Sequence, residues 1–189
     1  MITVSLQEKR GTMPTLEKAV LGGGCFWCIE AVYNRVIGVH SALSGYSGGT
    51  RSNPSYEQVC TGLSGHAEVV EIMFDPSVIR YEDLLMVFWE IHNPTTLNVQ
   101  GADKGTQYRS VIYYTTETQK EQALASISQA QKSFSNPIVT ELSPLSEFFA
   151  AETYHQNYYS EHSTQGYCTA VIAPKLEKFM KNFGDKVKK

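Results

Sequence analysis

The sequence lacks the features that mark several specialised classes of protein. No stretch approaches the roughly 18 consecutive apolar residues that a membrane-spanning helix needs, and the N-terminal stretch has no apolar core of a secretory signal. No block of Lys and Arg is interleaved with aromatic residues, and the net charge is only −3. We therefore expect a cytoplasmic protein that binds neither membranes nor nucleic acid.

Cysteine is also scarce, and its scarcity narrows the possible roles of the thiols. Four cysteines in 189 residues (Cys25, Cys28, Cys60 and Cys168) are too few for a disulfide scaffold. A structural zinc site usually needs a second close pair of Cys or His, and the five histidines are scattered. We expect no metal, and the close pair of cysteines then favours redox or nucleophilic chemistry.

The chain is long enough to bury a core, with 42% apolar residues, and it has no internal repeat, low-complexity stretch or linker. We predict one domain over residues 1–189, with about 1–15 and 184–189 loosely ordered. Hydrophobic periodicity predicts the order strand, helix, strand, strand, helix, strand. This order is typical of an α/β fold, more closely a two-layer α+β, ferredoxin-like split βαβ plait. The six segments are 17–23, 28–36, 39–49, 66–75, 81–92 and 109–116.

Three further segments extend the predicted plait with extra helices and long loops. Thr116 and Gln119 are spaced for a capping box at the start of a helix over 116–134. A strand is predicted over 137–142 and a helix over 150–162.

The stretch GGGCFWCIEAVY (22–33) places Cys25 at a strand-to-helix turn. Unpaired backbone N–H groups at a helix N-terminus favour a thiolate, so we expect a lowered pKa and a nucleophilic Cys25. Phe26 and Trp27 would then line a pocket beside the sulfur. The alternative is that both rings pack in the core and Cys25 is an inert apolar side chain.

Glu68 is unusual because strand alternation places it on the same face as Val70, Ile72 and Phe74. A carboxyl among apolar side chains has a raised pKa, so it can stay protonated near neutral pH and act as a general acid. The alternative is that Glu68 lies at the open end of its strand and is solvated.

Polar residues in two loops are weaker candidates. The glycines around GADKG (101–105) indicate a tight loop that would direct Asp103 and Tyr108 toward the top of the sheet. Tyr56 has a phenol that would suit a pocket, although the chain has eleven tyrosines. The stretch HQNYY (155–159) is equally compatible with a place in the core.

Four motifs together resemble those of the peptide methionine sulfoxide reductases of the A type. They are GCFWCIE (24–30), GHAEVV (65–70), GADKGTQYRS (101–110) and AETYHQNY (151–158), and the resemblance extends from about residue 18 to 183. It implies a single catalytic domain, a monomer, that reduces methionine S-sulfoxide, free or in proteins, as a repair of oxidative damage. It implies no cofactor beyond an external thiol such as thioredoxin or dithiothreitol.

The resemblance also implies roles for individual residues. Cys25 corresponds to the nucleophile that attacks the sulfoxide sulfur, and Glu68 corresponds to the acid that protonates the departing oxygen. The pocket for the substrate would comprise five side chains: Phe26, Trp27, Tyr56, Asp103 and Tyr108. The rings of Phe26 and Trp27 would hold the methyl group.

Cys25 would become a sulfenic acid, which condenses with a second thiol to a disulfide. This chain departs from the common family pattern because Cys28 replaces a glycine after GCFW, and it also has Cys168 near the C-terminus. Both are candidates for the resolving cysteine; proximity slightly favours Cys28 as the first. Cys60 is interpreted as structural.

Two other functions remain to be compared. A thioredoxin-like disulfide oxidoreductase also carries CxxC at a strand–helix junction but needs no buried acid. A non-catalytic peptide-binding module would use Phe26 and Trp27 to hold methionine side chains and would need no thiol.

Overall fold

The computed structural model describes residues 13–189, so most of the predicted loose N-terminal segment lies outside the described residues. The strands are β1 (Glu17–Gly22), β2 (Val39–Ser47), β3 (Ala67–Phe74), β4 (Val99–Gln100), β5 (Asp103–Lys104), β6 (Val111–Tyr114), β7 (Glu141–Pro144) and β8 (Phe148–Ala150). The α-helices are α1 (Phe26–Tyr33), α2 (Tyr56–Cys60), α3 (Tyr81–Ile91), α4 (Glu117–Gln131), α5 (Tyr158–His162) and α6 (Ala173–Asn182). Short 3₁₀ or π-helical turns are η1 (Thr106–Tyr108), η2 (Thr153–His155), η3 (Cys168–Ile172) and η4 (Gly184–Lys186).

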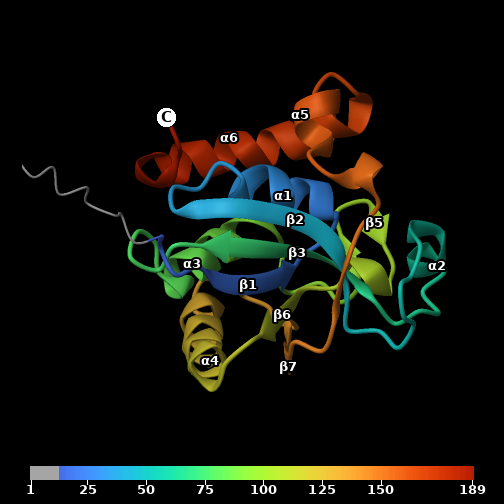
Figure 1. The fold of residues 1–189 in the computed structure, drawn as a ribbon, viewed down its shortest axis with the longest axis horizontal. Coiled ribbons are helices and arrows are strands. Elements are labelled where there is room, and N and C mark those ends of the chain that lie inside the picture. The colour runs from blue at the N-terminus through green and yellow to red at the C-terminus, as the bar shows by residue number, and fades with distance from the viewer. Residues whose placement is uncertain (1–12) are drawn as a thin grey trace, which may run out of the picture.

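A curled sheet of six strands in the order β7-β6-β1-β3-β2-β8 forms the centre of the fold (Figure 1). Neighbouring strands are antiparallel except for β6 and β7, which are parallel. Strands β4 and β5 form a separate two-stranded ribbon. The predicted mixed α/β architecture is confirmed.

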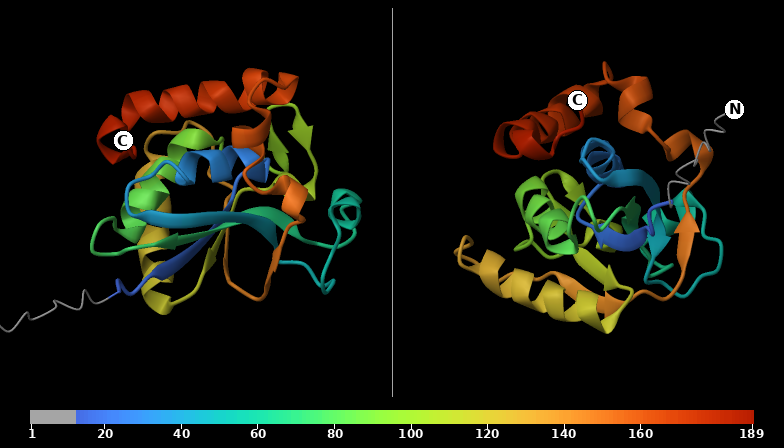
Figure 2. Two further views of the ribbon diagram at one scale, coloured as in Figure 1. Left: turned by 45° about the horizontal axis from the view of Figure 1, so that its top comes forward. Right: turned by 60° about the vertical axis from the view of Figure 1, so that its left-hand side comes forward.

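The two faces of the sheet have different surroundings because successive side chains of a strand point to opposite faces. On one face, Leu21 of β1 and Val70 of β3 join the main core with α1, whereas Val20 and Val69 belong to a smaller apolar cluster on the other face. Helix α6 runs over α1, which lies between it and the sheet (Figures 1 and 2). The N-terminal ends of α1 and β3 are buried, as Phe26 and Glu68 show.

Helix α3 confirms the predicted apolar stripe, since all four of its members are buried: Leu84, Leu85, Phe88 and Ile91. The continuous helix predicted over 150–162 is wrong. Gln156 is extended and Asn157 has a φ of 53°, so the segment divides into the turn η2 and the short helix α5. A left-handed residue interrupts a right-handed helix, and Asn tolerates this conformation better than most residues.

Two other local predictions need correction. At α4, the Thr116 side chain accepts from the Gln119 N–H, but the Gln119 side chain accepts from the Thr115 N–H rather than from Thr116, so only half of the capping box forms. The strand predicted over 137–142 is displaced to β7, Glu141–Pro144, where its partner β6 continues the parallel ladder.

The C-terminal segment, predicted to be loosely ordered over 184–189, makes specific backbone hydrogen bonds. The Ile37 N–H donates to the Lys186 carbonyl at 2.8 Å, and the Lys188 N–H donates to the Arg35 carbonyl at 2.8 Å. Helix α6 precedes it and was not predicted. No helix between residues 13 and 189 combines the length and apolar character needed to cross a membrane.

Candidate active site

Cys25 lies between the end of β1 and the start of α1, where it is the N-cap residue of the helix. The preceding Gly24 has a φ of +91°, and a Cβ there would come within 2.9 Å of the Gln100 side chain. Glycine is therefore required at this tight approach, because other residues carry a Cβ and disfavour positive φ. The turn buries Cys25, which is 8% exposed, at the edge of the main core.

Glu68 lies on the sheet face that α1 covers, as strand alternation predicts, and it is 1% exposed. Its Oε2 accepts a hydrogen bond of 3.0 Å from the Phe26 N–H, one of the unpaired donors at the start of α1. Burial raises the pKa of Glu68 to about 8, against the lowering effect of the Phe26 N–H, and the charge of Asp103 raises it further. The solvated alternative is excluded, and the raised pKa favours the protonated form of Glu68 at neutral pH.

The thiols of Cys25 and Cys28 form a hydrogen-bonded pair. Burial raises the pKa of Cys25, and the hydrogen bond to Cys28 raises it further. The hydrogen bond from Cys25, aided by the charge of Lys175, lowers the pKa of Cys28 to about 7 despite its burial. Burial and the neighbouring thiol thus oppose the lowering of the Cys25 pKa that the helix terminus alone predicts. Near neutral pH the pair as a whole loses one proton.

Residues from the C-terminal part of the chain surround Cys28. Tyr167 and Lys175 both approach its sulfur, and each lowers the pKa of Cys28 and favours the thiolate. Cys168, fully buried in η3, lies in the same apolar cluster, and its pKa is raised by burial and by the charge of Cys28. The structure therefore brings together both candidates for the resolving cysteine.

Phe26 and Trp27 occupy different positions beside the thiols. Phe26 is buried, with its ring centroid 5.7 Å from that of Tyr46. Trp27 is half-buried, stacks on Tyr158 with ring centroids 3.7 Å apart, and donates its indole N–H to His155 Nδ1 at 3.2 Å. Phe26 thus belongs to the main core, whereas Trp27 lies at its edge and is held by Tyr158 and His155.

Tyr56 and Tyr108 lie near Glu68 from two separate segments. Burial raises the pKa of Tyr108, and the charge of Glu68 is the next cause. The same two causes raise the pKa of Tyr56, and so does the neighbouring thiol of Cys60, which is exposed. Cys60 is thus at the rim of the site rather than in the core.

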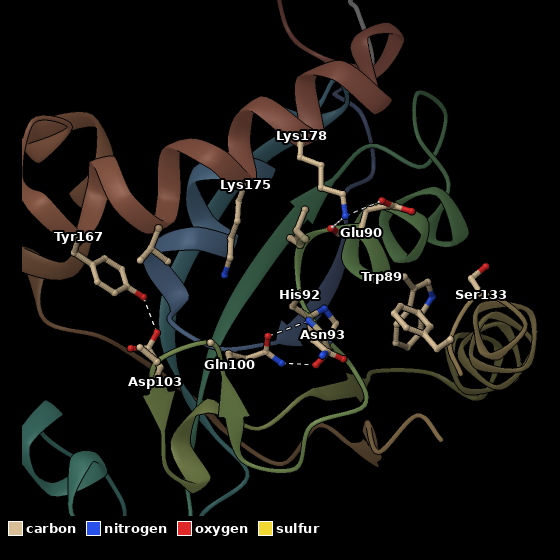
Figure 3. Close-up of a pocket in the computed structure, with 15 residues that line it drawn as sticks. Trp89, Glu90, His92, Asn93, Gln100, Asp103, Ser133, Tyr167, Lys175 and Lys178 are labelled. Atoms are coloured by element: carbon tan, nitrogen blue, oxygen red, sulfur yellow. Dashed lines mark hydrogen bonds and ion pairs between the residues drawn. The ribbon is translucent and has the colours of Figure 1, made fainter. Parts of the chain in front are cut away.

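Asp103 accepts a hydrogen bond of 2.7 Å from the Tyr167 hydroxyl (Figure 3). These two residues also line a cavity of about 500 Å³ between the end of α3, the β4–β5 ribbon and α6. Lys175 and Lys178 project into it from α6 (Figure 3). The lining includes neither Cys25 nor Glu68, so this cavity adjoins the candidate site rather than containing its chemistry.

Four side chains at the site were not predicted from the sequence: Glu152, His155, Tyr167 and Lys175. The motif AETYHQNY drew attention to the first two but gave them no role, and nothing in the pattern around Tyr167 and Lys175 distinguishes them from surface residues. Among residues 13–189, no group of three or more His, Cys, Asp or Glu side chains is arranged to hold a metal.

A buried thiol pair in which the pKa of Cys28 is lowered, beside a buried carboxyl whose pKa is raised, is the arrangement of a thiol-based oxidoreductase with its own acid. A family model described as peptide methionine sulfoxide reductase matches residues 17–187. The chain therefore belongs to the peptide methionine sulfoxide reductase family, and the resemblance found in its sequence is confirmed.

Individual relatives agree with this assignment. "Peptide methionine sulfoxide reductase MsrA" of Polynucleobacter asymbioticus is 56% identical over 173 residues, which cover 90% of this chain and 91% of that protein. MsrA of Saccharolobus solfataricus is 56% identical over 173 residues, covering 92% and 98%. The protein is thus an enzyme of this class.

Solved structures show the same fold. Mxr1 from Saccharomyces cerevisiae in reduced form has a TM-score of 0.75 and 33% identity, over 81% of this chain and 89% of that chain. Mxr1 in complex with Trx2 has a TM-score of 0.53 and 22% identity, over 82% and 92%. The second match shows the shared fold alone.

Proposed function

We propose that the protein reduces methionine S-sulfoxide, free or in proteins, to methionine, and so repairs oxidative damage. The observation that carries the proposal is the contact between Glu68 and the start of α1. The Glu68 carboxyl, whose pKa is raised, accepts a hydrogen bond from the Phe26 N–H. Phe26 directly follows Cys25 in the sequence, so this contact places the carboxyl near the Cys25 thiol. Family membership indicates the class of reaction, and this contact indicates which residues would carry it out.

The first step must overcome the weak electrophilicity of a sulfoxide sulfur and the poor leaving ability of its oxygen. Glu68 donates its proton to the sulfoxide oxygen, while Cys25 attacks the sulfur and its own proton passes along the hydrogen bond to Cys28. The bond that this attack forms between the Cys25 sulfur and the substrate sulfur then breaks, as the protonated oxygen moves from the substrate sulfur to the Cys25 sulfur. One thiol and one sulfoxide thus become one sulfenic acid and one methionine.

The substrate would bind against an aromatic wall, the rings of Phe26 and Trp27. The methyl group would lie against these rings, and the phenols of Tyr56 and Tyr108 would donate hydrogen bonds to the sulfoxide oxygen. Asp103, held by the Tyr167 hydroxyl, would complete the polar side of the pocket.

The second step is resolution of the sulfenic acid. Cys28 attacks the Cys25 sulfur, forming a disulfide and releasing water. Its hydrogen bond to Cys25 favours it over Cys168 as the first resolving thiol. Cys168, whose pKa the charge of Cys28 raises, would accept the disulfide in a second exchange, which moves the disulfide away from the substrate pocket.

An external dithiol would complete the cycle without any cofactor. Thiol–disulfide exchange needs a thiolate that attacks the protein disulfide, which is the chemistry of thioredoxin and, in vitro, of dithiothreitol. Mxr1 has been solved with Trx2, and we propose a thioredoxin-type partner for this chain as well.

We further propose one catalytic domain built on a split βαβ plait, acting as a monomer in the cytoplasm. In support, the strands β6-β1-β3-β2 are neighbours in that order, and helices α1 and α3 connect strands of this set. The main core contains residues from Ala19 to Phe183, so no separate second core is needed. The remaining strands and helices would be additions to this plait.

The test is reduction of the separated S and R diastereomers of a blocked methionine sulfoxide with dithiothreitol. The proposal predicts turnover of the S form alone and its loss in Cys25→Ser. Cys60→Ser serves as the control, because Cys60 is exposed and serine has a side chain of similar size. Absence of turnover of both forms, together with reduction of insulin disulfides, would instead support a thioredoxin-like oxidoreductase.

A further inference from the structure

His155 is a buried titratable residue that the proposed chemistry does not use. It is 2% exposed and lies in η2, directly beneath the aromatic wall. Its ring centroid is 5.2 Å from that of Phe26 and 4.5 Å from that of Tyr56. The imidazole therefore touches residues on both sides of the proposed substrate pocket.

The hydrogen bond with Trp27 determines which imidazole nitrogen carries the proton. An indole N–H can only donate, so His155 Nδ1 must accept, and the neutral ring carries its proton on Nε2. Burial lowers the pKa of His155, which keeps the ring neutral at pH 7. Within the described residues, Nε2 has no hydrogen-bond partner, and the nearest carboxylate oxygen is Glu152 Oε2 at 3.8 Å.

Glu152 connects this ring to the opposite wall of the pocket. Its Oε1 accepts from the Tyr56 N–H at 2.7 Å, and its Oε2 accepts from the Tyr46 hydroxyl at 2.8 Å. The negative charge also faces the His155 Nε2–H and so favours the tautomer that accepts from Trp27. One carboxylate thus holds Tyr56 directly and Trp27 through His155.

We propose that Glu152 and His155 are positioning residues that set the distance between the Trp27 and Tyr56 walls of the substrate pocket. This inference rests on the proposed function, because it assigns the two walls to the methyl group and the oxygen of the sulfoxide. Neither residue touches the reacting atoms. Their loss should weaken binding of substrate and transition state alike, which raises KM and leaves kcat nearly unchanged.

Two substitutions separate the hydrogen bond from the packing of the ring. His155→Phe keeps an aromatic ring and removes the acceptor, whereas His155→Asn removes the ring and places an oxygen near the position of Nδ1. We expect KM for the blocked S-sulfoxide to rise about tenfold in His155→Phe, with kcat within about threefold, and to recover mostly in His155→Asn. His40→Phe is the matched control because His40 is exposed on β2.

The indole proton of Trp27 provides a readout that does not depend on turnover. The chain has two tryptophans, so its nitrogen–proton NMR spectrum has two indole signals. Trp89 donates to Ser126 Oγ, so the signal that moves in Ser126→Ala belongs to Trp89 and the other to Trp27. We expect the Trp27 signal to move in His155→Phe and to return toward its original position in His155→Asn.

A long-range nitrogen–proton spectrum of the unaltered protein reports the tautomer of His155 directly, even if a variant fails to fold. A proton on Nε2 supports the proposal, and a proton on Nδ1 overturns it. If the wild-type protein is active, a normal KM and an unmoved Trp27 signal in folded His155→Phe would also overturn the proposal. Failure of the wild-type protein to reduce any sulfoxide would instead overturn the proposed function on which this inference rests.

Discussion

Replacement of Glu68 by glutamine removes the acidic proton of the carboxyl but keeps an oxygen that can support the start of α1. The amide oxygen of the new side chain can still accept the Phe26 N–H, whereas Glu68→Ala leaves that buried donor without its partner. If Glu68 is the general acid, Glu68→Gln should reduce kcat/KM by about a hundredfold or more at neutral pH. Glu68→Ala should lose more, because the start of α1 is disturbed as well.

The raised pKa of Glu68 determines how strongly the activity depends on pH. With a pKa of about 8, about nine-tenths of Glu68 is protonated at pH 7, compared with about 0.3% of a carboxyl at its ordinary pKa. Activity also requires that the thiol pair has lost one proton, with a pKa of about 7. The wild-type kcat/KM should therefore follow a bell with its maximum at about pH 7.5 and fall about twentyfold two pH units to either side.

The pH profile of Glu68→Gln tests the assignment of the alkaline limb. Glutamine does not titrate, so the fall above about pH 8 should disappear while the acid limb, which belongs to the thiol pair, stays in place. The measurement is kcat/KM for the blocked S-sulfoxide between about pH 5 and 10, with dithiothreitol at saturation throughout. An alkaline limb that persists unchanged in Glu68→Gln, or full activity of both variants, would refute the role of Glu68.

Three further perturbations test other parts of the account. Lys175→Met removes a cation that favours the Cys28 thiolate. The acid limb of the kcat/KM profile, and the pH at which iodoacetamide modifies the thiols, should therefore move to higher pH. An unmoved acid limb would contradict this. After one equivalent of S-sulfoxide without reductant, Cys28→Ser should accumulate a sulfenic acid that dimedone traps, whereas Cys168→Ser should form a disulfide. The reverse pattern would make Cys168 the first resolving thiol. Burial raises the pKa of Glu30 to about 7, so the folded state binds this proton more tightly than the unfolded state, and stability falls as pH rises from about 4.5 through 7. Glu30→Gln should therefore gain a few degrees in Tm relative to wild type between about pH 5 and 8, and a pH-independent difference would contradict this.

The local pattern predicted the parts of the site that depend on one segment at a time. Strand alternation identified the buried face of β3 and hence Glu68, and the glycines before Cys25 identified the turn at the start of α1. The hydrogen bond between Glu68 and the start of α1 joins residues 42 positions apart in the sequence. It depends on the pairing of β1 with β3, which hydrophobic periodicity does not specify. The quoted motifs supplied that connection through the family resemblance.

The surroundings of Cys28 were not predictable, and neither was its low pKa. A helix-terminus argument uses only local backbone, so it assigned the thiolate to Cys25. The pKa of Cys28 depends on its burial and on Tyr167 and Lys175, which lie more than a hundred residues further along the chain. The break at Asn157 escaped prediction for a similar reason. Its N–H bonds to the buried Glu30 carboxylate, a tertiary contact that fixes the start of α5.

The central claim is that the Cys25–Cys28 pair transfers the sulfoxide oxygen and then closes into a disulfide. The most direct test is a single turnover without reductant, in which the fully reduced protein receives one equivalent of methionine S-sulfoxide and its cysteines are mapped by mass spectrometry. We predict one equivalent of methionine and a disulfide between Cys25 and Cys28, or between Cys28 and Cys168 after exchange. Formation of methionine while Cys25 and Cys28 both remain free thiols would contradict it.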